Sequence, residues 1–137
     1  MMYRREDQIQ IACVNWFTYS YPELFLLLYH AANEGDANSA RGGRMKAMGV
    51  KRGVPDLILD VSRHGYHSLG IELKTEKGKQ SPYQKEFEKV FTAEGNLYKI
   101  CRSLDEFIQL CKWYLGDPGD PNKEALRKIL EYKSNEE

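Results

Sequence analysis

The fold of this chain is decided by residues 53–74, which read GVPDLILDVSRHGYHSLGIELK. Branched aliphatic residues fill both arms of this stretch and turn-forming residues lie between them, so the arms are predicted to be two strands of a hairpin. If the hairpin turns about His64, position 56 lies opposite position 72. The carboxylates of Asp56 and Glu72 would then face each other, with Cβ atoms about 5 Å apart.

Two carboxylates placed opposite each other repel, and that destabilises a sheet unless a cation lies between them. Lys74 follows Glu72 by two residues, and side chains alternate along a strand, so Lys74 is predicted to point to the same face. One short hairpin would therefore gather Asp56, Glu72 and Lys74. Asp60 has the same parity as Asp56 but lies about 13 Å further along the strand, and it is predicted to face solvent.

Pro-Asp on one strand and Glu-x-Lys on the next resemble the PD-(D/E)xK nuclease superfamily. From Glu6 to Leu115 the chain is similar to the virus-type replication-repair nuclease (VRR-NUC) family, in its short standalone phage or bacterial form. The similarity is carried by Asn33, by GVPD at 53–56, by Gln84 after Ser-Pro, and by YKICR at 98–102.

The resemblance implies an α/β fold with a PD-(D/E)xK nuclease core, in which a mixed sheet of about four strands is flanked by helices. It implies a nuclease domain at residues 1–116, with residues 117–137 as a C-terminal helical extension of the same domain. It also implies metal ligands: Asp56, Glu72, the backbone carbonyl of Leu73, and Glu6. Hard oxygen ligands of this kind favour Mg²⁺ or Mn²⁺.

Glu6 lies in the first turn of a helix predicted over residues 5–19, where apolar side chains recur at helical spacing. An acid in that turn is also favourable by itself, because it faces the positive end of the helix dipole. The resemblance carries a first-helix glutamate of the family onto Glu6. Asp7 and Gln10 are the alternatives.

Lys74 and Gln84 complete the implied catalytic set. Lys74 would orient or deprotonate the attacking water, and Gln84 would position Lys74 or that water. Gln84 has a structural role as well, because Ser81 and Pro82 open a predicted helix that ends at Gly95, and Gln84 is three residues after Ser81, as in a capping box. Both roles can hold if the side chain faces the sheet.

The net charge of the chain is zero, but residues 41–79 carry a net charge of +5 and residues 103–137 a net charge of −3. A basic, glycine-containing segment just before the proposed catalytic strand favours phosphate contact over a merely solvated face. The candidate DNA-binding residues are Asn33, Arg41, Arg44, Lys46, Lys51, Arg52, Lys77 and Lys79.

The rest of the chain indicates one globular domain of 137 residues, 42% hydrophobic and 29% charged. A strand is predicted at 24–30 and a loop at 33–43, within which Ser39 is predicted to cap a short helix that ends near Met48. A strand at 96–102, a helix from Ser103 to Gly116 and a last helix at 122–132 are predicted after the hairpin and the helix that Ser81 opens. The three cysteines lack metal-ligand spacing and are predicted to be reduced core residues. No apolar run approaches the ~20 residues of a membrane span, the N-terminus turns acidic too early for a signal peptide, and we expect a cytoplasmic protein.

The predicted function is that of a metal-dependent DNA endonuclease. The resemblance implies a structure-selective enzyme for branched, flap or Holliday-junction DNA in replication, repair or recombination, acting as a homodimer. A non-catalytic DNA-binding module fits less well because Asp56, Glu72 and Lys74 are all intact. A sequence-specific, restriction-type endonuclease is the other alternative.

Overall fold

The structure is a computed structural model that describes residues 5–32 and 40–118. Asn33, the predicted cap Ser39 and the predicted helix at 122–132 lie outside these residues. The described elements are, in chain order, α1 (Arg5–Ser20), η1 (Pro22–Leu27), β1 (Leu28–His30), α2 (Ala40–Ala47), β2 (Leu57–Leu59), β3 (Leu69–Leu73), α3 (Pro82–Ala93), β4 (Leu97–Cys101) and α4 (Leu104–Leu115).

The four strands form one mixed sheet in the order β1-β2-β3-β4. β1 and β2 are antiparallel, β2 and β3 are antiparallel, and β3 and β4 run parallel. In the hairpin Leu57 pairs with Ile71 and Leu59 with Leu69, so position 56 comes opposite position 72 as predicted. The chain turns at His64 and Gly65, both of which have positive φ angles, of 54° and 83°.

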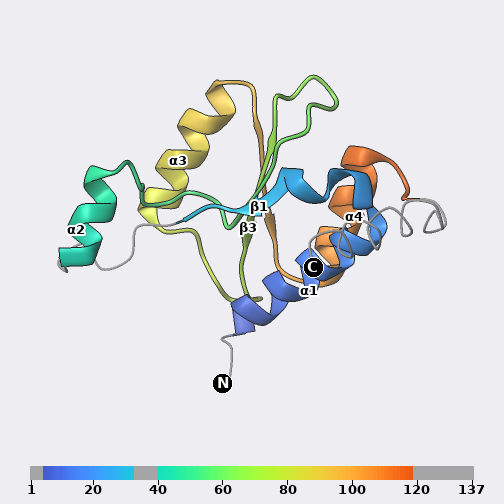
Figure 1. The fold of residues 1–137 in the computed structure, drawn as a ribbon, viewed down its shortest axis with the longest axis horizontal. Helices are drawn as coiled ribbons and strands as arrows, with labels where there is room; N and C mark the ends of the chain where they lie inside the picture. Colours follow the sequence, from blue (N-terminus) through green and yellow to red (C-terminus); the bar gives the residue numbers. More distant parts are fainter. Residues whose placement is uncertain (1–4, 33–39, 119–137) are drawn as a thin grey trace, which may run out of the picture.

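Helices cover both faces of this sheet, which confirms the predicted α/β architecture. Figure 1 shows α3 on one side of the sheet, and α1 with α4 on the other. Cys13 and Phe17 of α1 and Phe107 of α4 pack with the buried side chains of β2 and β3 to form the main core. On the opposite face Phe91 of α3 lies against Gly70, where a Cβ atom would come within 2.9 Å of the ring.

The prediction of a strand at 24–30 is wrong for residues 24–27. Residues 22–27 form a 3₁₀ helix that begins at a proline, and only Leu28–His30 pair with β2. The apolar run suggested a buried strand, but most of its side chains stay outside the core: Leu26 is 76% exposed, whereas Leu28 is buried and Leu24 packs against the core. Pro22 fixes a φ angle suited to a helical first turn, and that favours the observed conformation.

All three cysteines are free and buried, as predicted. Burial raises the pKa of the Cys13 and Cys101 thiols to about 12, so both stay protonated at neutral pH. No helix among the described residues is long and apolar enough to cross a membrane.

Candidate active site

The hairpin brings two carboxylates together on the face of the sheet that α3 covers. Glu72 lies within β3 and is only 2% exposed, whereas Asp56, one residue before β2, is half-buried. A hydrogen bond joins the two carboxyl groups. The Oδ2 atom of Asp56 also accepts a 2.7 Å hydrogen bond from the backbone N–H of Leu73. The pair is therefore fixed by backbone pairing as well as by its own contact.

The protonation of Glu72 is strongly shifted by this environment. Burial, followed by the hydrogen bond and the negative charge of Asp56, raises the pKa of Glu72 to about 9. The charge of Lys74 and a hydrogen bond from Tyr98 act in the opposite direction, lowering the pKa of Glu72. At neutral pH the Glu72 carboxyl of the metal-free protein is consequently protonated.

Lys74 directly follows β3. Its N–H donates a 3.0 Å hydrogen bond to the carbonyl of Cys101 on β4. All described peptide bonds are trans, and in a trans peptide the carbonyl points away from the following N–H. The Leu73 carbonyl therefore points away from β4, toward the side of the strand on which Asp56 lies. The structure brings Asp56, Glu72, this carbonyl and Lys74 into one place.

Glu6 and Asp7 are exposed in the first turn of α1, a helix that packs on β3. Within residues 5–32 and 40–118, no third acidic, histidine or cysteine side chain joins Asp56 and Glu72 in a group of three possible metal ligands. The role of Glu6 as a ligand stays a prediction.

Gln10, the third candidate in α1, lies against His30, which in turn contacts the backbone of Asp56. Its Nε2 lies 3.2 Å from Nδ1 of His30, and that same Nδ1 lies 2.7 Å from the carbonyl oxygen of Asp56. A protonated Nδ1 therefore donates to the backbone of Asp56. Sequence analysis did not assign His30 to the site, because the contact depends on the pairing of β1 with β2.

Tyr98 is the second residue that sequence analysis did not place in the site. It is buried on β4, and its phenol oxygen lies 3.4 Å from Oε2 of Glu72. Burial is the main cause that raises the pKa of Tyr98 above its ordinary value, so the phenol stays a hydrogen-bond donor. The parallel pairing that sets Gly70 beside Tyr98 carries the phenol toward the site.

Gln84 occupies the capping box predicted for it. Its Oε1 accepts from the Ser81 N–H at 2.8 Å, and its own N–H donates to the Ser81 hydroxyl at 3.2 Å. The side chain is 9% exposed and uses only its oxygen in the cap, so the amide Nε2 stays available as a donor. Its active-site role remains a prediction.

The first turn of α3 is close to the segment that leads into Asp56. Gly53 has a φ of 81°, and a Cβ atom there would lie 2.3 Å from the Tyr83 carbonyl oxygen. Only glycine fits this approach, because it tolerates the left-handed backbone conformation and has no side chain to clash.

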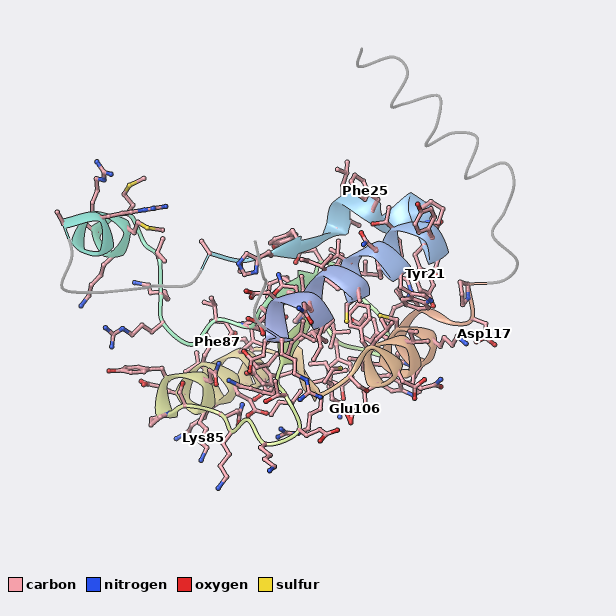
Figure 2. The ribbon with its side chains drawn as sticks, turned by 90° about the horizontal axis from the view of Figure 1, so that it is seen from below. Tyr21, Phe25, Lys85, Phe87, Glu106 and Asp117 are labelled. Carbon is pink, nitrogen blue, oxygen red and sulfur yellow. The ribbon has the colours of Figure 1, made fainter. Side chains whose placement is uncertain are left out.

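The described members of the predicted DNA-binding set fall into two groups, one on or beside α2 and one in the loop after β3. Helix α2 lies apart from the sheet and the other helices in both views (Figure 1 and Figure 2). Arg52 is half-buried, with its guanidinium 5.0 Å from the ring centre of Tyr83 and its Nη1 3.1 Å from the phenol oxygen. The other described members are exposed: Arg41, Arg44, Lys46 and Lys51 on or beside α2, and Lys77 and Lys79 in the loop after β3.

Comparison with solved structures finds a protein described as a "VRR_NUC domain protein". The two structures superpose with a TM-score of 0.70 and 30% sequence identity, over 84% of this chain and 91% of that chain. No family model matches the sequence. A search of curated proteins finds no match either.

Proposed function

The chain belongs to the VRR_NUC domain family, nucleases of the PD-(D/E)xK type, and on that premise we propose that it hydrolyses DNA with the help of Mg²⁺ or Mn²⁺. The observation that carries the proposal is the Asp56–Glu72 pair. Holding two carboxyl groups against each other, with the buried Glu72 kept protonated at neutral pH, costs the fold stability, and a bound cation would compensate that cost.

The donor set fits a hard divalent cation. Asp56, Glu72 and the Leu73 carbonyl offer oxygen atoms only, as Mg²⁺ and Mn²⁺ prefer, and Glu6 is the proposed fourth ligand. Such an ion, when bound, polarises the scissile phosphate and acidifies a water molecule. The proton that Glu72 holds in the metal-free protein would be released on binding.

Lys74 is the proposed catalytic cation on the protein side. Its backbone is fixed to β4 through Cys101, and its charge lies close enough to Glu72 to lower the pKa of that carboxyl. We assign to it the orientation or deprotonation of the attacking water, and the offset of negative charge that develops on the phosphate. The amide nitrogen of Gln84 would position Lys74 or the water.

The basic residues on and after α2, with Lys77 and Lys79, form the proposed contact surface for the DNA backbone. Their positive charge suits a polyanionic substrate that a metal bridges to the acids. We further propose that the substrate is branched, as a flap, a fork or a four-way junction. A homodimer would present two such sites to two symmetric strands.

The test is a panel of linear, flap, fork and four-way DNA incubated with Mg²⁺ or Mn²⁺, with the Asp56→Asn variant run beside the wild type. We expect cleavage of at least one branched substrate that needs both the metal and Asp56. Tight binding without cleavage under every condition would instead indicate a DNA-binding module. Cutting at a fixed sequence of linear duplex would indicate a restriction-type enzyme.

A further inference from the structure

Arg102, the residue directly after β4, makes an unusual set of contacts. Its Nη1 atom lies 2.6 Å from the carbonyl oxygen of Gly78, 2.9 Å from that of Thr75 and 3.5 Å from that of Glu76. All three acceptors belong to the loop of residues 75–78, which follows Lys74. A single guanidinium thus gathers the backbone of one short loop.

The backbone next to Arg102 fixes the start of the same loop. Cys101 accepts the hydrogen bond from the N–H of Lys74, because β3 and β4 run parallel and end at the same edge of the sheet. Arg102 is itself anchored, since its N–H donates a 2.6 Å hydrogen bond to Oε2 of Glu106. Figure 2 labels Glu106, which lies in the first turn of α4. The loop after Lys74 is therefore tied to α4 through Arg102.

The loop in turn limits where the Lys74 side chain can go. It folds back through a 3.1 Å hydrogen bond from the Gly78 N–H to the Thr75 carbonyl. A Cβ atom at Gly78 would lie 3.3 Å from both Cβ and Cδ of Lys74, so the loop backbone lies against the aliphatic part of that side chain. Moving the loop would remove the backbone that packs against the aliphatic part of the Lys74 side chain.

We propose that Arg102 is a positioning residue for the nuclease reaction: by holding the 75–78 loop against Lys74, it fixes the Lys74 ammonium relative to the Asp56–Glu72 pair. The inference rests on the proposed function of that site. Hydrogen bonds from a charged donor are stronger than neutral ones, and a guanidinium offers several donors in a rigid plane, so lysine is a poor substitute here. Arg102 touches no reacting group in this account and acts through Lys74.

The test compares Arg102→Ala and Arg102→Lys with the wild type, and uses Arg63→Ala as the matched control. Arg63 is an exposed arginine that also donates to a backbone carbonyl, that of Ser62, but it lies at the hairpin turn. For Arg102→Ala we expect kcat to fall by about 10- to 100-fold, because small misplacements of a catalytic group are costly. KM for DNA and the affinity for Mn²⁺ should change less than twofold. Arg102→Lys should recover part of kcat, and Arg63→Ala should match the wild type.

Limited digestion with trypsin, without DNA or metal, gives a second readout that does not depend on activity. Arg102→Ala should be cut at Lys77 and Lys79 faster than the wild type, at a temperature where circular dichroism shows both folded. Equal cutting rates would overturn the proposal that Arg102 holds the 75–78 loop. A wild-type kcat in Arg102→Ala would overturn the positioning role while leaving the nuclease assignment intact. If the wild type cleaves no DNA but trypsin still cuts Arg102→Ala faster than the wild type, the proposed function would be lost while the role of Arg102 in holding the 75–78 loop would stand. If Arg102→Ala does not fold, kcat and the rate of trypsin cutting are measured on Arg102→Lys instead.

Discussion

The substitution Glu72→Gln should stabilise the metal-free protein, although it removes a proposed catalytic ligand. Glu72 is buried beside Asp56, and its pKa is raised to about 9 from the ordinary value of 4.5. The folded protein therefore keeps this carboxyl protonated at pH values where the unfolded chain has already lost the proton. Glutamine resembles the protonated side chain in shape and carries no titrating proton, so it avoids the cost.

The sign of the pH dependence follows from the direction of the shift. A raised pKa means that the stability contributed by the protonated carboxyl is fully present below pH 4.5 and is lost as the pH rises toward 9. In that window the stability of the wild type should fall, relative to Glu72→Gln, by about 1.4 kcal/mol per pH unit. At pH 7 the difference should be on the order of 3 kcal/mol in favour of the variant.

Urea unfolding in EDTA at pH 4.5, 7 and 8.5 measures this difference directly. At a slope of roughly 1–2 kcal/mol per molar urea, the midpoint at pH 7 should rise by about 1.5–3 M in the variant. Glu86→Gln, the same substitution at an exposed site on α3, should leave the midpoint unchanged at every pH. Equal midpoints for Glu72→Gln and the wild type at pH 7, or a difference that does not grow with pH, would refute the reasoning.

Three other predictions concern the DNA surface, the oligomer and Tyr98. Replacing Arg44, Lys51 and Arg52 together by Ala should weaken DNA binding. The slope of log affinity against log salt concentration should become shallower by about 0.9 for each lost phosphate contact, and an unchanged slope would count against this surface. Light scattering at micromolar concentration should give twice the chain mass, and a monomer both alone and with four-way DNA would exclude the dimer. Tyr98→Phe should weaken Mn²⁺ binding at pH 7 by several-fold, because losing a hydrogen bond of about 1 kcal/mol raises the pKa of Glu72 further; an unchanged affinity would contradict its link to Glu72.

The hairpin register could be predicted from the sequence because it is a local property. A turn at His64 and the two-residue period of a strand are enough to set position 56 opposite position 72, and no distant contact is needed. The roles of Asp56 and Glu72 in binding a metal are still predictions, but their juxtaposition is a structural fact. The capping box of Ser81 and Gln84 is local in the same way.

The contacts that sequence analysis did not foresee all join segments far apart in the chain. Tyr98 reaches Glu72 only because β4 returns parallel to β3 after a crossover helix, and Arg102 meets the 75–78 loop for the same reason. His30 reaches Asp56 through the pairing of β1 with β2. The apolar run before His30 was predicted as a strand because its composition fits a buried strand, whereas the fold leaves most of its side chains exposed.

The most direct test of the active site is the single-turnover rate of DNA cleavage with Mn²⁺ by Asp56→Asn, measured beside Asp60→Asn. The two substitutions are chemically identical and lie four residues apart, but Asp60 is exposed and accepts a hydrogen bond from Tyr29 instead of facing Glu72. If Asp56 holds the metal, Asp56→Asn should stay folded, bind DNA and lose cleavage, while Asp60→Asn cleaves at the wild-type rate. Wild-type cleavage by Asp56→Asn would contradict the assignment.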